Sequence, residues 1–364
     1  MSKKYILLIL SLIFLISCSN EDSTSSQTNN SVWEQKTNML SNWVDNFIIP
    51  YHDTLLNNLN NLESAAEGFA TDMSLNNLEL LRNKWLTAYK SWQYVEMFNI
   101  GPAEQSFYYQ KMNVYPANIS KITELIGSGD FTNLNNSPFY SAQGFPALDY
   151  LLFGLASDDQ SLLSLFSSND KYFNYMNEVI ERMISNTNYV INGWTSYKQD
   201  FVNSVENTAT SSANKITNDF IFYYEKGFRS NKFGIPIGVF SGGNIFPEKV
   251  EGYYNRNVSR TLALEALTAI EEFFTGKGGY SLKGFIDNFA TGDNSNLSNQ
   301  IVDQFNTVRS TVNQLDSSFV TQINEDLSSM NATYDIIQTG TVLLKTDMLS
   351  VLHIATDYVD ADGN

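Results

Sequence analysis

The chain has 364 residues, of which 43% are hydrophobic and 17% charged, and its formal net charge at pH 7 is −17. This length allows one large domain or two. The acidic charge argues against nucleic acid and anionic lipid surfaces as partners. With two histidines, one cysteine and no His-Glu-x-x-His pattern, the sequence disfavours a zinc protease centre.

The first residues have the pattern of a lipoprotein signal peptide. Lys3 and Lys4 form a basic start, and the apolar stretch 5–16 is too short for a permanent membrane span. Leu15-Ile16-Ser17-Cys18 resembles a lipobox, whose cysteine becomes the lipidated first residue. We therefore predict a signal peptide at 1–17 and lipidation of Cys18, which anchors the chain to a membrane. Loss of the two lysines would change the charge from −17 to −19. The alternative is an ordinary signal peptide with a chance cysteine.

The residues after Cys18 bear on localisation. Ser19, rather than an aspartate, follows the cysteine, as in lipoproteins sorted to the outer membrane, and Glu21-Asp22 resembles the export signal of some surface lipoproteins. Residues 23–31 are only Ser, Thr, Gln and Asn, so we predict a flexible tether over 18–31. The expected location is the cell envelope, as an outer-membrane lipoprotein that faces the periplasm or the exterior.

Helical periodicity dominates the rest of the chain. Apolar residues recur at three- and four-residue spacing in four segments: 78–98, 262–274, 301–319 and 341–358. Strand-type alternation is scarce, so the predicted fold class is all-α. We expect two helical-bundle domains, at 32–192 and 193–364.

Proline and glycine mark the expected ends of these helices. Pro50 should kink or divide a first helical segment at 32–66. Gly101-Pro102 should end the second helix, and Gly276 should close a helix that begins near Ser259. The stretch from Gly227 to Tyr254 is rich in Gly and Pro and predicts a long loop, a feature that is usually functional.

The segment 144–154, Gly-Phe-Pro-Ala-Leu-Asp-Tyr-Leu-Leu-Phe-Gly, carries the most information. It resembles the signature of the imelysin-like family, also called the peptidase M75 group, which reads Gly-x-His-x-x-Glu followed by an apolar helix and a glycine. Gly144 matches the glycine, Pro146 stands in the histidine position and Asp149 in the glutamate position. Further segments resemble the family in the same order: 46–51, 85–92 followed by 96–102, 234–238, 250–259, and 345–348 together with 360–363.

The resemblance implies two helical bundles with a shared site near their junction, in a group tied to iron uptake and iron-regulated envelope proteins. In the family pattern, His and Glu three residues apart share a helix face and could hold one metal ion. Here Pro146 offers no side-chain nitrogen that could bind a metal ion, and it suits the start of a helix. For Asp149 two interpretations stay open, a first-turn acid favoured by the helix dipole or a ligand.

Three carboxylates are the candidate ligands for a small molecule or metal ion. Glu96, Asp149 and Glu251 all lie in family-like segments and could converge at the domain junction, where they would suit iron or another hard cation. The alternative is that each is a solvated or capping acid. His52 and His353 lack a Gly-x-Ser-x-Gly elbow beside them, and His353 lies in an apolar helical run that favours a structural role.

These observations favour a non-enzymatic envelope lipoprotein that is linked to iron acquisition and binds a ligand between two helical domains. One alternative is a metallopeptidase of the M75 type. The other is a helical glycan-binding lipoprotein, which would need exposed aromatic platforms, whereas the aromatic residues here lie on helical core stripes. The oligomeric state is left open by the sequence.

Overall fold

The computed structural model describes residues 22–354 together with 356 and 357. The predicted signal peptide and Cys18 lie outside these residues. Every regular element in the described part is a helix and no strand occurs there, which confirms the all-α prediction. Among the described helices, none combines the length and apolar character that a membrane span requires.

The first long helix is divided at the predicted place. Helix α1 (Asp22–Trp43) passes through the π-helical turn η1 (Val44–Ile48) into α2 (Ile49–Thr71), with Pro50 in the first turn of α2. A π-turn is a common break where the regular hydrogen-bond ladder is interrupted, and proline lacks the donor that continues it. Residues 22–31, expected to belong to a flexible tether, form the start of α1, because adding a residue to a formed helix gains one hydrogen bond.

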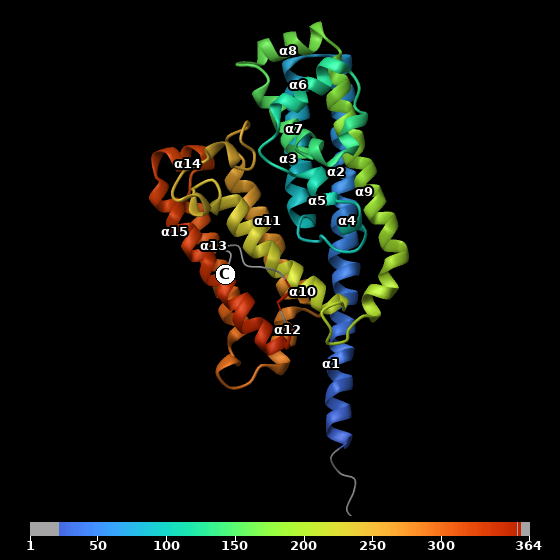
Figure 1. The fold of residues 1–364 in the computed structure, drawn as a ribbon, viewed down its shortest axis with the longest axis vertical. Coiled ribbons are helices and arrows are strands. Elements are labelled where there is room, and N and C mark those ends of the chain that lie inside the picture. Colours follow the sequence, from blue (N-terminus) through green and yellow to red (C-terminus); the bar gives the residue numbers. More distant parts are fainter. Residues whose placement is uncertain (1–21, 355, 358–364) are drawn as a thin grey trace, which may run out of the picture.

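The next helices complete the N-terminal half, which we define as residues 22–203. Its further elements are α3 (Leu75–Val95), α4 (Pro102–Gln105), α5 (Tyr108–Met112), α6 (Ile119–Ser128), the short turns η2 (Thr132–Asn135) and η3 (Ser137–Ala142), α7 (Gly144–Asp149), η4 (Tyr150–Gly154), α8 (Asp159–Ser168) and α9 (Lys171–Asn203). Helices α2, α3 and α9 run alongside one another (Figure 1). The predicted domain boundary at 192/193 falls inside α9, which continues unbroken to Asn203.

The predicted stripe of α3 is confirmed, whereas its predicted end is wrong. Leu78, Leu81, Trp85, Tyr89 and Trp92 are all buried. The helix ends at Val95, and Pro102 begins α4 instead of stopping α3. Proline is well placed at the start of a helix because the first backbone N–H groups have no partner within the helix.

The C-terminal half comprises residues 204–354 together with 356 and 357, and it is also helical. Its elements are α10 (Ser212–Phe222), η5 (Tyr223–Gly234), η6 (Val239–Ser241), η7 (Pro247–Lys249), α11 (Ser259–Thr275), η8 (Gly276–Gly278), α12 (Leu282–Phe289), η9 (Gly292–Asn294), α13 (Leu297–Gln314), α14 (Phe319–Glu325), α15 (Leu327–Val342), η10 (Leu343–Met348) and α16 (Leu349–Leu352). Gly276 closes α11 in a left-handed conformation, as predicted.

The expected loop from Gly227 to Tyr254 begins later than predicted. Residues 223–234 form the π-helix η5, and the loop proper follows Gly234. A Cβ atom at Gly227 would lie 2.5 Å from the ring of Tyr223, and one at Gly234 would lie 2.7 Å from the ring of Tyr334. These glycines therefore permit close packing, Gly227 within its own helix and Gly234 against a neighbouring one. In the sequence, glycines with this role cannot be distinguished from glycines of a loop.

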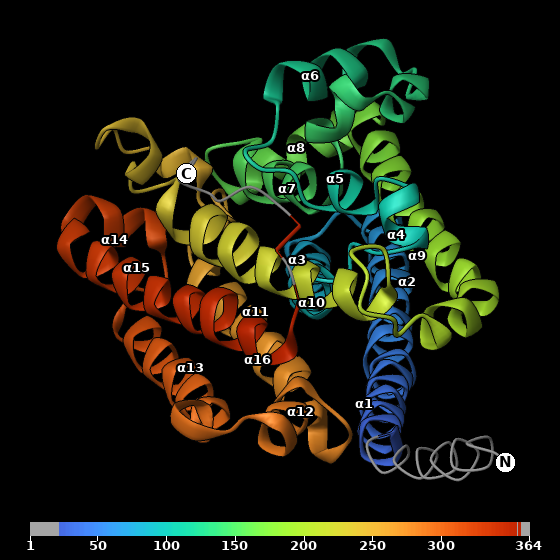
Figure 2. The same cartoon turned by 60° about the horizontal axis from the view of Figure 1, so that its bottom comes forward.

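The two halves share one continuous buried core. Helix α11 packs against α3 of the N-terminal half and against α13 of its own half. In Figure 2 the yellow helix labelled α10 lies between the green helices and the red helices. Near the junction, the ring of Trp43 stacks on that of Phe273 with centroids 4.3 Å apart, and the indole N–H donates to the Phe273 carbonyl oxygen over 3.3 Å. The junction is thus a packed apolar interface in which buried polar groups need specific partners.

Candidate ligand-binding site

The segment that begins at Gly144 is locked against the end of α5. Gly144 has a φ of +74°, and a Cβ atom there would lie 2.1 Å from the backbone oxygen of Met112. Only glycine meets both demands. Pro146 is buried in the first turn of α7, as its third residue rather than its first, where a missing N–H removes no intrahelical bond.

Asp149, the last residue of α7, accepts hydrogen bonds from two backbone N–H groups. Its Oδ2 accepts the N–H of Tyr254 over 2.8 Å and its Oδ1 accepts the N–H of Asn255 over 3.0 Å. Burial raises the pKa of Asp149 to about 7, although the two hydrogen bonds favour the ionised form. The first-turn interpretation is therefore wrong, because Asp149 ends its α-helix and holds the loop of the opposite half. The ring of Tyr254 packs directly on Gly154, where a Cβ atom would lie 2.2 Å from it.

A second predicted carboxylate, Glu251, lies in a fully bonded network. The Lys232 ammonium group lies 2.6 Å from Glu251 Oε2. The side-chain amides of Gln93 and Asn113 donate to Glu251 Oε1 over 3.1 and 2.8 Å. Lys232 also donates to Gln93 Oε1 over 2.7 Å, and the Tyr89 hydroxyl donates to Asn113 Oδ1 over 2.7 Å. The network therefore joins α3 and the residue after α5 to η5 and the following loop.

Glu96, the third predicted carboxylate, is close to this network but outside its hydrogen bonds. Its Oε2 lies 3.6 Å from Lys232 Nζ, and neither of its oxygens has a hydrogen-bond partner among the described residues. Burial raises the pKa of Glu96 above its usual range, against the attraction of Lys232. Burial also acts to lower the pKa of Lys232, but Glu251 and Glu96 outweigh it, so the net pKa of Lys232 is raised and the group stays protonated.

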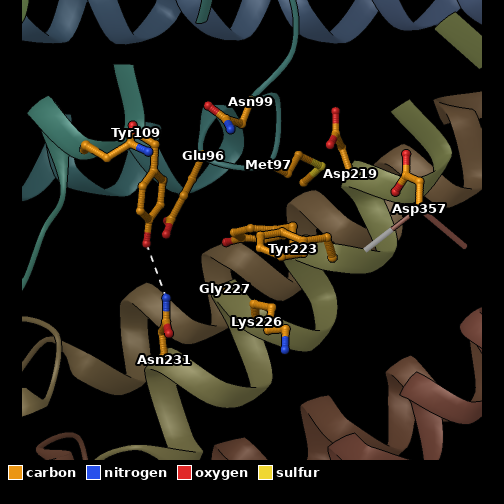
Figure 3. Close-up of a pocket in the computed structure, with 12 residues that line it drawn as sticks. Glu96, Met97, Asn99, Tyr109, Asp219, Tyr223, Lys226, Gly227, Asn231 and Asp357 are labelled. Carbon is orange, nitrogen blue, oxygen red and sulfur yellow. Dashed lines mark hydrogen bonds between the residues drawn. The ribbon is translucent and has the colours of Figure 1, made fainter. Parts of the chain in front are cut away.

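A cavity of about 530 Å³ lies beside Glu96. Glu96, Met97 and Tyr109 reach it from the N-terminal half. The opposite wall comes from α10 and η5, with Asp219, Tyr223 and Lys226, and Figure 3 shows the two sets of side chains facing each other. A single hydrogen bond crosses the gap between these walls in the figure, from Asn231 Nδ2 to the Tyr109 hydroxyl over 3.4 Å.

The three predicted ligands do not form one cluster. Glu96 lines the cavity, Glu251 is connected to it through Lys232, and Asp149 borders a separate narrow space that is closed by the loop it holds. Within the described part of the chain, no group of three or more His, Cys, Asp or Glu side chains is arranged to hold a metal ion. The side chains around Glu96 suit a molecule with hydrogen-bond donors better than a metal ion that needs several carboxylates.

Several site residues escaped the sequence reasoning. Gln93 carried a usable signal, because it is a polar residue beside Trp92 on a helix whose neighbouring positions are apolar, and it lies three residues before Glu96. Lys232 and Tyr223 carry no such signal, because Lys232 lies within the segment whose Gly and Pro content predicts a loop and Tyr223 lies just before it. Their roles depend on contacts with the other half.

Comparison with known proteins agrees with this architecture. The profile of the peptidase M75 family, imelysin, matches residues 48–345. An imelysin-like protein from Psychrobacter arcticum 273-4 has a similar structure, with a TM-score of 0.71 and 16% identity over 90% of this chain and 98% of that one. A structure from Parabacteroides distasonis ATCC 8503, described provisionally as an iron-regulated protein A precursor, has a TM-score of 0.69 and 18% identity over 87% and 95% of the two chains. No curated protein matches the sequence.

Proposed function

The chain belongs to the imelysin family, peptidase M75, and on that premise we propose that it is a non-enzymatic ligand-binding lipoprotein of the cell envelope, linked to iron acquisition. The signal-peptide pattern and Cys18 support the envelope location and the lipid anchor. The similar structure described provisionally as an iron-regulated protein A precursor supports the link to iron.

The cavity beside Glu96 carries the proposal of binding. Both halves line it, and it holds a buried carboxylate whose oxygens lack hydrogen-bond partners among the described residues. A cavity with an apolar lining and a few convergent polar groups is the usual form of a small-molecule site. The engagement of both Asp149 oxygens by backbone, together with Pro146 in the histidine position, supports binding rather than metal-dependent hydrolysis.

Calorimetry on the mature protein tests the proposal with ferric citrate, ferrous iron, calcium and haem. The link to iron acquisition requires that at least one of these binds the wild type. Asn99→Trp should then abolish that binding, because Asn99 is an exposed residue that lines the cavity and the larger side chain would fill it. Asn76→Trp, an equally bulky change at an exposed position of α3 outside the cavity, is the matched control and should bind as the wild type does. If the wild type binds none of the four, the proposed link to these ligands is wrong.

A metallopeptidase of the M75 type is the rival function. It requires cleavage of an unfolded protein substrate that a chelator inhibits and that Asp149→Ala abolishes. If the protein shows chelator-sensitive cleavage and Asp149→Ala abolishes it, our proposal is wrong. If cleavage survives the substitution, Asp149 is not part of the site that produces it.

A further inference from the structure

The cavity beside Glu96 contains buried polar atoms that lack hydrogen-bond partners within the described residues. They are both carboxylate oxygens of Glu96, the hydroxyl of Tyr223 and Oε1 of Gln110. Glu96 is 3% exposed and Tyr223 is 4% exposed. A buried polar atom without a partner costs about 1–3 kcal/mol, so such atoms are rare in native proteins. Three of the four are acceptors, which indicates that a bound molecule would supply donors.

The neighbouring network explains why the Glu96 carboxylate in particular lacks a short hydrogen bond. Lys232 has three N–H donors, and its short contacts, of 2.6 and 2.7 Å, go to Glu251 and Gln93. Glu251 therefore has three donor groups around it. Glu96 has the Lys232 ammonium group at 3.6 Å and interacts with the nearby Tyr223 hydroxyl, but neither makes a short, well-aligned hydrogen bond to it. In Figure 3 the carboxylate of Glu96 lies between Tyr109 and Tyr223, on the side of the cavity.

The charges around the cavity favour a cationic ligand. Three acids line it, namely Glu96, Asp219 and Asp357, against the single basic side chain of Lys226. Burial raises the pKa of Glu96 and Asp219, and a bound cation would favour their ionised forms. Lys226 is itself 3.9 Å from the carboxylate of Glu225. An anionic ligand would meet like charges, which disfavour association, in a protein whose total charge is already −17.

The rest of the lining favours an organic cation over a metal ion. Met97, Tyr109, Phe222 and Tyr223 provide apolar and aromatic surface. Aromatic faces attract ammonium and guanidinium groups and also bury the carbon framework that carries them. A metal ion would instead need several oxygen ligands at short range, and the described residues offer no cluster of three His, Cys, Asp or Glu.

We propose that this cavity binds a small organic cation, whose ammonium or guanidinium group donates hydrogen bonds to Glu96 while its carbon framework packs on Tyr223 and Met97. This inference rests on the proposed ligand-binding function, because it concerns the same cavity. It adds the chemical class of the ligand.

Calorimetry with three amines and two matched analogues tests the ligand class. The amines are tyramine, putrescine and agmatine, and the analogues are tyrosol, which is neutral, and 4-hydroxyphenylacetate, which is anionic. We expect at least one amine to bind saturably and neither analogue to bind. Glu96→Gln should weaken amine binding roughly tenfold to a hundredfold, because it replaces a charged hydrogen-bond partner by a neutral one. Glu79→Gln removes the same charge from an exposed position of α3 and should leave binding unchanged.

A second variant keeps the test decisive if Glu96→Gln fails to fold, as judged by circular dichroism. Asp219→Asn removes a half-buried acid from the same cavity and should weaken amine binding several-fold. The inference is wrong if the anionic analogue binds more strongly than the amines, if no amine binds, or if neither variant changes amine binding. Binding of haem or ferric citrate without amine binding would overturn the ligand class alone. Binding of no compound in either set would also overturn the proposed function.

Discussion

At the scale of single residues, Gly144 is the position that the fold can least replace. Its positive φ disfavours any residue with a Cβ atom, and the carbonyl oxygen of Met112 occupies the place that this atom would take. Because the clash is with backbone rather than with a flexible side chain, it is relieved only if α7 moves away from α5. Glycine at this place in the family-like motif thus has a packing reason that is independent of any ligand.

We predict that Gly144→Ala lowers the free energy of unfolding by at least about 2 kcal/mol, from left-handed strain plus the clash. Gly129→Ala is a matched control, because Gly129 has a φ of +70° with no atom within 4 Å of the added Cβ. The control should cost about 1 kcal/mol, from strain alone. Urea denaturation measures both losses, and equal losses would show that the contact with Met112 is unimportant.

At the scale of elements, the α7–η4 segment holds the loop that precedes α11. Asp149 accepts the backbone N–H groups of Tyr254 and Asn255, and Gly154 receives the Tyr254 ring. Glu251 lies in the same loop, so the loop's position also sets the hydrogen bonds around Lys232. The family-like motif therefore acts on the cavity indirectly, by fixing the loop that carries Glu251.

We predict that Asp149→Ala lowers the free energy of unfolding by about 2 kcal/mol, because two backbone donors lose their acceptor. Hydrogen exchange at the amides of Tyr254 and Asn255 should become faster, while exchange in the centre of α2 stays unchanged. Asp53→Ala, at an exposed position of α2, should change neither property. Unaltered protection of the two loop amides would show that other contacts hold the loop.

At the scale of the whole molecule, several buried ionisable groups make stability depend on pH. Burial raises the pKa of Asp149 and of Asp219 to about 7, and it raises the pKa of Glu96. In the unfolded chain these carboxyls have ordinary pKa values near about 4. Between about pH 4 and pH 7 these carboxyls therefore hold more protons in the folded protein than in the unfolded chain. His52 acts in the opposite direction, since burial lowers its pKa to about 4 and keeps it neutral when folded.

We predict that the free energy of unfolding is highest at about pH 4 to 5, falls as the pH rises to about 7 and changes little from there to about pH 9, because three raised carboxyls outweigh one histidine. Each group contributes up to about 1.4 kcal/mol per pH unit in this range. Urea denaturation across the range measures the slope, which should be smaller in Asp219→Asn. A stability that increases from pH 5 to 7 would contradict the raised pKa values.

Much of the architecture could be predicted from local sequence pattern. The apolar spacing predicted the α3, α11 and α13 stripes, Pro50 predicted the division of the first helix, and Gly276 predicted a helix end. The motif at 144–154 and its companion segments predicted the family. Helical periodicity and capping are properties of neighbouring residues, which is why a linear sequence reveals them. The lipid anchor at Cys18 stays a prediction.

The partners of the buried charges were decided only by the tertiary structure. Glu251 meets Gln93 across 158 positions of the chain, and Asp149 meets Tyr254 across 105. In the sequence all three carboxylates look alike, yet one binds backbone, one is saturated by Lys232 and two amides, and one faces a cavity. Desolvation and hydrogen-bond geometry produce that difference, and both exist only after distant segments have packed together.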